Sequence, residues 1–421
     1  MSTEDDGQIA HETYLPDEPA GRHGIALCLS GGGYRSALFH LGVLRRLDEL
    51  GTLTRVDTVS AVSGGSLLAA FLADLAPVWP ADGRLPEFDS KVAPALRSFT
   101  KKNIRTMWVL RRAAPWNWGD STVAVEGLVR RYEDITSLHL AELPANPRYI
   151  FSATDLSWGV NWVSERARVG SYPAGYVQSS EWSVARAVAA SSCFPPAFEP
   201  MPVNLAPEQF HGGHERRERR AALIAKLRLA DGGLYDNLGL EPVWKDHSVL
   251  LVSDGGATFD AAAVEGTFKT VGRYLAVQSR QASALRKRWL IAGFKKEVMR
   301  GVYLGIGSTT TSFAVGAPGY SDDLVDEIIS EVRTDLDFFS DAEAEVLQNH
   351  GYMLADVAMR SHGQAWIDSG VPPLNVPFPT WLDEGLVRSA LVDSAKKRTL
   401  GRWRSVELVK DKLGALRKLL S

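Results

Sequence analysis

The segment that most constrains the fold is residues 24–51, which read GIALCLSGGGYRSALFHLGVLRRLDELG. The apolar run Ile25–Leu29 predicts a buried strand, and leucines three residues apart predict a helix that ends at Gly51. Between strand and helix stand Ser30 and three consecutive glycines. Because glycine loses the most conformational freedom on folding, three together indicate a turn where the backbone must come close to another group.

The same order of strand, turn and helix recurs along the chain. A second apolar strand, VDTVSAV, is followed by another glycine turn and the helix SLLAAFLADLA. The stretches RYIFSATDL and HSVLLVSDG predict further interior strands. Strands that alternate with helices indicate an α/β fold, with a mostly parallel central sheet and helices on both of its faces.

The 421 residues are expected to form one domain with additions. Residues 1–22 are acidic and predict a flexible lead-in, and residues 396–421 predict a basic helix or tail. The domain would occupy residues 23–395, with insertions around 100–120 and 204–228, where the α/β pattern is interrupted.

The composition is that of a soluble globular protein. Hydrophobic residues make up 45% of the chain and the formal net charge is -3, which gives no indication of a nucleic-acid partner. The N-terminus lacks the apolar core of a signal peptide, and no apolar run is long enough to span a bilayer. Cys28 and Cys193 lie in apolar surroundings and predict buried thiols. We therefore expect a cytoplasmic protein, with peripheral contact at the inner face of the membrane as an extension of that expectation.

The first glycine turn predicts an anion site. Backbone N–H groups are unpaired where a helix begins, and the helix dipole adds to their attraction for negative charge. Such a turn can hold a phosphate or form an oxyanion hole. A phosphate-binding P-loop would end in Gly-Lys-Ser/Thr, whereas this loop continues Gly33-Tyr34-Arg35-Ser36. The loop therefore departs from the phosphate pattern.

The second turn places a serine between strand and helix. Ser63 follows the strand VDTVSAV, and Gly65 comes two residues later, which matches a nucleophile elbow. Ala61 stands where the elbow usually has a glycine, and alanine is small enough for strand and helix to pack closely. The pattern indicates a nucleophilic serine one strand–helix unit after an anion-attracting loop.

A serine nucleophile needs a base, and the chain offers two kinds. His350 and His362 occupy the late region where a Ser-His-Asp triad would place its histidine, but no strand leads into either. Asp231 and Asp254 each end a predicted strand and precede two glycines, so either carboxylate could reach a serine. Spacing alone does not decide between the two aspartates.

Together these stretches resemble the patatin-like phospholipases and acyl hydrolases of bacterial type, whose architecture is related to α/β hydrolases. The resemblance lies in SGGGYRS, AVSGG and DGGLYDNLG, with support from FSATDLSWG, ARAVAASSCFPPAFEPM and VRTDLDFFSDAEAEVLQNHGY. It implies Ser63 as nucleophile and Asp231 as base, since the Asn-Leu continuation after Asp231 favours it over Asp254. The remaining implied site residues are the oxyanion-hole glycines Gly31, Gly32 and Gly33, and Arg35, which would hold the loop or meet a lipid phosphate.

The implied activity is hydrolysis of lipid esters through an acyl-enzyme, as in a phospholipase A or a lysophospholipase. The expected substrate is a membrane phospholipid or another lipid ester, and the chemistry needs no metal or other cofactor. A soluble carboxylesterase or an acyltransferase of the same fold is the alternative, and a Ser-His-Asp enzyme a further one. A regulatory partner or an oligomer would fit the additional segments.

Two basic stretches each allow two interpretations, as a membrane contact or as a packed surface segment. KKNIRTMWVLRRAAPWNW combines lysine and arginine with methionine and tryptophan, including Trp108, Trp116 and Trp118, and RWRSVELVKDKLGALRKLL forms the basic tail. Each is expected either to contact anionic lipid or to pack on the protein with its charges in solvent.

Overall fold

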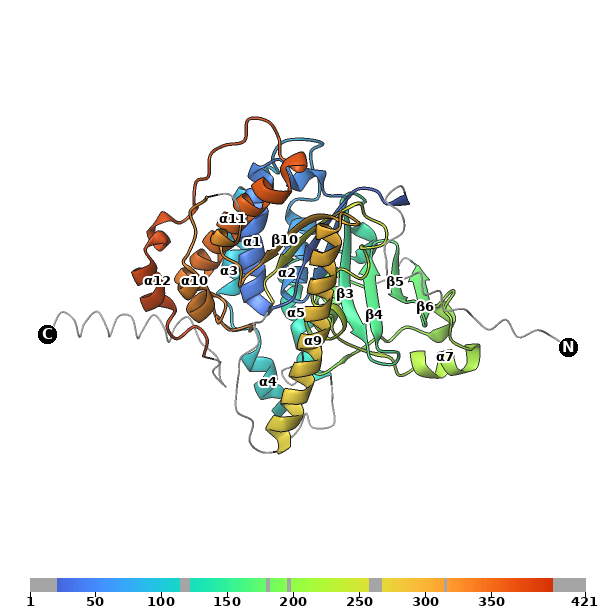
Figure 1. Cartoon of the computed structure of the whole chain (residues 1–421). Coiled ribbons are helices and arrows are strands. Elements are labelled where there is room, and N and C mark those ends of the chain that lie inside the picture. Colours follow the sequence, from blue (N-terminus) through green and yellow to red (C-terminus); the bar gives the residue numbers. More distant parts are fainter. Residues whose placement is uncertain are drawn as a thin grey trace.

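The computed structural model describes residues 21–113, 122–178, 182–194, 198–256, 267–313 and 316–396 (Figure 1). Trp116, Trp118, most of the predicted lead-in and nearly all of the basic tail lie outside these residues. Arg22, which the prediction placed in the lead-in, is buried and donates a hydrogen bond to the carbonyl of Val298 at 2.7 Å.

The centre of the protein is a ten-stranded mixed sheet in the order β10-β9-β1-β2-β3-β4-β5-β6, with β8 beside β3 and β7 beside β8. The strands β10, β9, β1, β2 and β3 are parallel, whereas β4, β5, β6 and β8 pair antiparallel. The predicted α/β class with a largely parallel sheet is confirmed. The bounds are β1 Ile25–Leu29, β2 Thr58–Val62, β3 Arg148–Asp155, β4 Val160–Glu165, β5 Arg168–Ser171, β6 Gly175–Gln178, β7 Met201–Pro202, β8 Arg228–Asp231, β9 Val249–Asp254 and β10 Arg300–Gly305.

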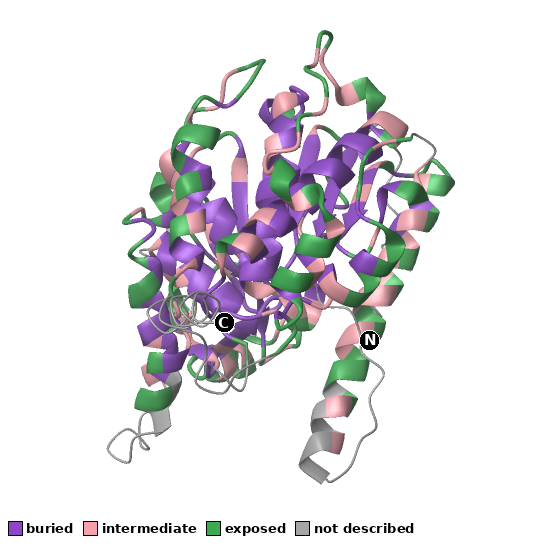
Figure 2. Cartoon of the chain, turned by 90° about the vertical axis from the view of Figure 1, so that its left-hand side faces the viewer, coloured by how far each residue is buried: buried purple, intermediate pink, exposed green. Residues whose placement is uncertain are grey.

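Helices cover both faces of this sheet. In β1, Leu27 and Leu29 join the larger core cluster, while Ala26 and Cys28 point to the other face and join a smaller one. Such alternation follows from the two-residue period of a strand. Residues of α1, α2, α5, α6 and α11 fill the larger cluster, and Leu290 of α9 belongs to the smaller one. Figure 2 shows the buried residues gathered around the central strands.

The longer helices are α1 Gly33–Glu49, α2 Gly64–Leu75, α5 Val123–Tyr132, α6 Val184–Ser192, α9 Thr267–Lys295 and α11 Asp341–His362. Shorter ones are α3 Ala93–Thr100, α4 Thr106–Ala113, α7 Arg217–Ile224, α8 Gly233–Asp236, α10 Asp322–Leu324 and α12 Glu384–Leu391. None of the helices in the described part of the chain has the length and apolar character needed to cross a membrane. Cys28 and Cys193 are free and buried, as predicted.

The first predicted insertion contains α4, whose Trp108 faces inward. Only 8% of Trp108 is exposed, and its ring lies against Gly127 of α5, where an added Cβ would come within 2.0 Å of the ring. The guanidinium of Arg111 lies over the same ring at 4.7 Å from its centroid. Trp108 therefore packs α4 onto α5 and is not available to a membrane. The second insertion contains α7, which buries Ile224.

Candidate active site

β2 and β8 end head to head beside β3, and this brings the predicted serine and aspartate together. β2 pairs with the first residues of β3 and ends with Val62 opposite Ser152. β8 runs in the opposite direction along the remainder of β3 and ends with Asp231 opposite Ala153. Because Ser152 and Ala153 are neighbours, the two strand ends meet, and Ser63 follows Val62 directly.

Ser63 lies on a strained turn at the beginning of α2. Its φ of 50° and ψ of -115° lie outside the conformations that a residue with a side chain ordinarily adopts. The backbone N–H of Ser63 donates to Oγ of Ser191 at 2.8 Å, and Ser191 Oγ donates in turn to the carbonyl of Ser152 at 2.6 Å. Ser191 therefore ties the turn to β3. Sequence reasoning did not identify Ser191, although it lies within one of the stretches that carried the family resemblance.

Asp231 is a buried carboxylate at the end of β8, next to the Ser63 turn. Burial raises the pKa of Asp231 to about 6, although the hydrogen bond from the Gly233 N–H, at 2.8 Å, and the nearby Ser63 hydroxyl oppose that rise. The backbone of Asp231 is held by Thr154, whose Oγ1 donates to its carbonyl at 2.8 Å. The arrangement gives Ser63 a carboxylate that can accept its proton near neutral pH.

The glycine loop lies against the serine turn. A side chain at Gly31 would place its Cβ 3.1 Å from Cβ of Ser63, and one at Gly64 would come within 2.1 Å of the Gly33 carbonyl oxygen. Gly32 and Gly33 have φ values of 145° and 61°, in the region that favours glycine. The absence of side chains here is therefore what allows α1 and α2 to begin side by side.

The three glycine N–H groups differ in their partners. That of Gly31 donates to the carbonyl of Asn237 at 3.1 Å, and so holds the loop to the segment that follows Asp231. Among the residues that the structure describes, those of Gly32 and Gly33 have no acceptor. Gly32 and Gly33 are therefore better placed than Gly31 to donate to a bound anion, and the dipole of α1 acts in the same direction.

Arg35 is buried in the structure and binds backbone carbonyls. Its guanidinium donates to Gly255 at 3.1 and 3.3 Å, to Ser330 at 2.6 Å and to Val332 at 2.8 Å. Only 2% of the residue is exposed. Of the two roles considered for Arg35, these contacts support holding the loop, since a headgroup phosphate could not reach a side chain enclosed in this way.

Asp254, the second candidate base, has other partners. It ends β9, which is separated from β2 by β1. Its carboxylate accepts hydrogen bonds from Tyr303 at 2.7 Å and from the Gly256 N–H at 2.9 Å, and forms an ion pair with Lys287 at 2.5 Å. Burial alone would raise the pKa of Asp254, but Lys287 and the two hydrogen bonds outweigh it and lower the pKa below its ordinary value.

The turn after Asp254 supports the glycine loop. The N–H of Gly255 donates to Oγ of Ser30 at 2.9 Å, and the carbonyl of Gly255 accepts from Arg35. The buried ring of His40 also links β9 to the residue that follows β1. Its nitrogens lie 2.6 Å from Ser253 Oγ and 3.0 Å from the Ser30 carbonyl.

Neither of the predicted triad histidines contacts the serine. His350 is buried on α11 with Nε2 2.7 Å from the carbonyl of Ile306, and burial lowers its pKa to about 4. His362 is exposed, and its ring lies beside Phe313. Within the described residues, no hydrogen bond or ion pair joins either ring to Ser63, so the geometry gives no support to the triad alternative.

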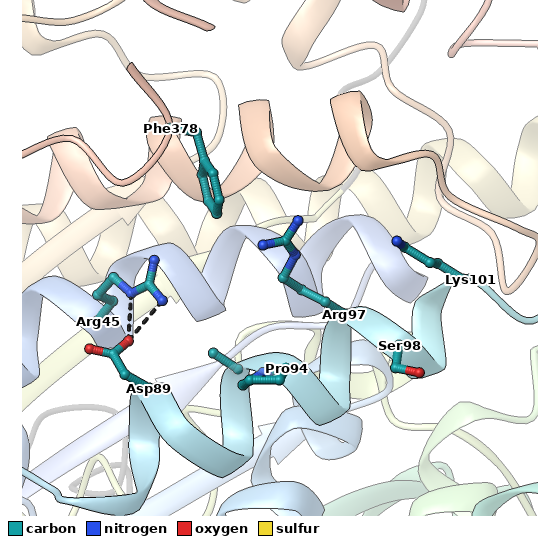
Figure 3. A pocket seen from close by; sticks show the side chains of 8 residues that line it. Arg45, Asp89, Pro94, Arg97, Ser98, Lys101 and Phe378 are labelled. Atoms are coloured by element: carbon teal, nitrogen blue, oxygen red, sulfur yellow. Dashed lines mark hydrogen bonds and ion pairs between the residues drawn. The ribbon is translucent and has the colours of Figure 1, made fainter. Parts of the chain in front are cut away.

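A separate pocket of about 460 Å³ lies between α1, α3 and Phe378 (Figure 3). It contains three basic side chains, but each of them is paired with a carboxylate. The pairs are Arg45 with Asp89 at 2.7 Å, Arg97 with Glu345 at 2.6 Å and Lys101 with Asp341 at 2.5 Å. The pocket includes none of the residues of the serine and aspartate turns, and its paired charges give no excess positive charge for an anion.

Comparisons with known proteins identify the family of this chain. The family model for patatin-like phospholipases matches residues 27–244, which is more than half of the chain. Human GIVD cytosolic phospholipase A2 is 11% identical with a TM-score of 0.44, over 82% of this chain and 62% of that one. VipD from Legionella pneumophila is 16% identical with a TM-score of 0.27, over 52% of this chain and 47% of that one. A search of curated proteins found no match. The match to the family model shows that the chain belongs to the patatin-like phospholipase family.

Proposed function

We propose that the protein is a lipid acyl hydrolase in which Ser63 is the nucleophile and Asp231 the base. The observation that carries this proposal is the meeting of the ends of β2 and β8, which brings the Ser63 turn next to the buried Asp231 carboxylate. Burial raises the pKa of this carboxylate to about 6. A carboxylate of that pKa is largely ionised at neutral pH, yet it is a stronger base than an exposed aspartate.

In the first half of the reaction, the Ser63 hydroxyl attacks the carbonyl carbon of an ester and Asp231 takes the hydroxyl proton. The N–H groups of Gly32 and Gly33 donate to the oxyanion that forms, and each such donor contributes about 3 to 4 kcal/mol of transition-state stabilisation in enzymes of this kind. When the intermediate collapses, Asp231 gives the proton to the departing alcohol and the acyl group remains on Ser63.

In the second half, water replaces the alcohol. Asp231 takes a proton from the water as its oxygen attacks the acyl carbonyl, and the same N–H groups stabilise the second oxyanion. Collapse releases the fatty acid and returns the proton to Ser63 Oγ. Every step uses groups of the chain itself and one water molecule, so acylation and deacylation share one base.

The proposed substrate class is a phospholipid or lysophospholipid. Family membership supports it, and so do two apolar side chains close to the base in the chain. Leu234, three residues after Asp231, is 37% exposed, and Phe194 is 54% exposed beside Cys193, whose carbonyl accepts the Asp231 N–H. Exposed apolar groups near the proposed base would favour an acyl chain over a polar substrate. A soluble carboxylesterase or an acyltransferase would use the same dyad and would differ in its products.

Fatty-acid release from mixed phospholipid liposomes, followed by mass spectrometry, tests the proposal. We expect release by wild type and by the control Ser90→Ala, an exposed serine far from the elbow in the chain, but not by Ser63→Ala. Identified products would show which ester bond is cleaved. Release by Ser63→Ala at the wild-type rate would contradict the proposal, whereas cleavage of short soluble esters alone would favour the carboxylesterase.

A further inference from the structure

Helix α9 begins on the side of the sheet where the parallel strands end, which is also the side of the active site. It connects β9 to β10, and these strands are parallel neighbours, so α9 must run antiparallel to both. Its N-terminus is therefore on the side where the parallel strands end, and Ser63 follows the end of β2 on that side. At 29 residues, α9 is about 43 Å long, much longer than either strand it connects.

The C-terminal part of α9 is attached to the protein. Leu290 is buried, Lys287 pairs with Asp254, and the guanidinium of Arg286 lies 3.4 Å from the Asp236 carboxylate. Asp254 ends β9, next to Gly255, whose N–H donates to Ser30, and Asp236 ends α8, next to Asn237, whose carbonyl accepts the Gly31 N–H. The helix is thus held firmly at one end, close to the site.

The described side chains in the N-terminal part of α9 do not enter the hydrophobic core. Among its side chains that the structure describes, none before Leu290 is buried. Tyr274 is 65% exposed, Val277 39% and Leu285 59%. Tyr274 and Leu285 are eleven residues apart, which is close to three helical turns, so they lie on one face. Figure 1 shows α9 extending beyond the sheet, and Figure 2 shows the same projection from the side.

Helix α4 projects at the same end of the molecule (Figure 1). Just before α4, Arg105 pairs with Asp335 at 2.8 Å, and the carbonyl of Asp335 accepts the N–H of Tyr34, next to the glycine loop. While Trp108 packs inward, Met107 is 42% exposed and Leu110 47%. Two helices with exposed apolar side chains therefore stand on the side of the molecule that carries the site.

The charge of both helices is of one sign. α9 contains lysine and arginine but no aspartate or glutamate, and the same holds for α4. The chain as a whole has a formal net charge of -3, so this basic character is local. Positive charge interleaved with exposed apolar groups fits an anionic lipid surface, where both contribute to binding. A nucleic acid would use the charges but would leave the apolar side chains without a partner.

We propose that α4 and the N-terminal part of α9 form a docking surface for an anionic bilayer, with Met107, Leu110, Tyr274, Val277 and Leu285 entering the headgroup region. The docked protein would turn the carboxyl ends of the parallel strands, where Ser63 lies, toward the membrane. The purpose of docking rests on the proposed function, but the binding itself does not depend on catalysis.

Co-sedimentation with vesicles tests the docking surface. The full chain is mixed with vesicles of phosphatidylcholine alone or with one third phosphatidylserine, at low and at high salt. We expect binding to the anionic vesicles that weakens at high salt. The fourfold variant Met107→Ser, Leu110→Ser, Tyr274→Ser and Leu285→Ser is expected to bind at least about tenfold more weakly. The control Val78→Ser removes a side chain that is 77% exposed. Val78 follows α2, on the side where the parallel strands begin, so this variant should bind as wild type.

Two further measurements separate this proposal from the dyad. Ser63→Ala should bind vesicles as wild type does, and the fourfold variant should hydrolyse a short soluble ester at the wild-type rate, which also shows that it is folded. Equal binding of the fourfold variant and wild type would overturn the docking surface. So would equal binding to neutral and anionic vesicles, or tighter binding to a DNA or RNA duplex that the four substitutions leave unchanged.

Discussion

Two turns of this protein have nearly the same local sequence and opposite electrostatics. Asp231 and Asp254 each end a strand, precede two glycines, are buried, and accept the N–H of the residue two positions later. The pKa of Asp231 is raised to about 6, mainly by burial, whereas Lys287 and Tyr303 outweigh burial at Asp254 and lower its pKa. The difference comes entirely from what the fold places opposite each carboxylate.

This comparison shows what a base requires in addition to a position on a turn. The Asp254 carboxylate is neutralised by a cation, so it has little tendency to take a proton from a hydroxyl. Its turn instead supports the glycine loop through Gly255. In the proposed mechanism, one Asp-Gly-Gly turn supplies the base and the other supports the glycine loop that would stabilise the oxyanion.

The largest difference between the two aspartates is expected in catalysis. Asp231→Asn removes the base but keeps the shape, so we expect hydrolysis of a soluble ester to fall by about a thousandfold or more. Asp254→Asn should retain activity within about tenfold, since it affects the loop only indirectly. Steady-state kinetics of both purified variants provide the measurement. A larger loss in Asp254→Asn than in Asp231→Asn would reverse the assignment.

The pH dependence of wild type gives the next effect. Because the base must be ionised, kcat/KM should rise about tenfold per pH unit below the pKa of about 6 and level off above it. Asp254 ionises below its ordinary value and should contribute no inflection in this range. A pH profile of kcat/KM for a soluble ester checks this, and a profile that is flat from pH 5 to 8 would contradict the assignment.

The two substitutions should change stability in opposite directions. The pKa of Asp231 is raised from 3.8 to about 6 on folding, so its ionisation costs stability as pH rises through 6. Asp231→Asn should therefore raise the free energy of unfolding at pH 8, by about 1 to 3 kcal/mol.

At Asp254 the sign is opposite. The lowered pKa of Asp254 stabilises the fold above pH 3.8, and this stabilisation is lost as pH falls through the lowered value. Asp254→Asn should lower the free energy of unfolding by about 1 to 3 kcal/mol, since it leaves Lys287 without its carboxylate.

Denaturant unfolding at pH 8 and at pH 4.5 compares the two variants with wild type. The stabilisation by Asp231→Asn should shrink at the lower pH, where the wild-type carboxyl is protonated. Stability changes of the same sign in both variants would indicate that the two carboxylates do not differ as described.

The smallest effect is expected from the histidines. His350→Gln keeps a donor for the Ile306 carbonyl, and His362→Ala changes an exposed ring, so hydrolysis should remain within about threefold of wild type for both. Activity measured per folded molecule checks this. A loss comparable to that of Ser63→Ala in either variant would restore the triad alternative.

The local part of the site could be predicted from the sequence, because each strand, turn and helix is determined largely by residues that are adjacent in the chain. The glycine loop, the Ser63 turn and the buried cysteines follow from apolar runs and glycine positions. The strands β4, β5 and β6 were not expected, since each has only four to six residues and gives a short periodic signal. The strand that ends at Asp231 was expected, but its antiparallel pairing with β3 was not, since pairing between distant segments leaves no periodic signal. The same reason hides the head-to-head meeting of β2 and β8, which is what places Asp231 beside Ser63.

Two further features depend on contacts that the sequence does not reveal. The support that Ser191 gives to the Ser63 backbone joins residues 128 positions apart. The partners of Asp254 come from α9 and β10, which follow it in the chain, and without them the two aspartates looked equivalent by spacing. Choosing between them therefore required either the family resemblance or the fold.

The assignment of Ser63 as nucleophile and Asp231 as base is tested most directly by the rate at which a fluorophosphonate modifies Ser63, followed by intact mass and peptide mapping. The reagent reports an activated serine whatever the natural substrate is. We expect a single modification at Ser63 in wild type and in Asp254→Asn, and almost none in Asp231→Asn. Undiminished modification of Asp231→Asn, with its loss in Asp254→Asn, would show that Asp254 and not Asp231 activates Ser63.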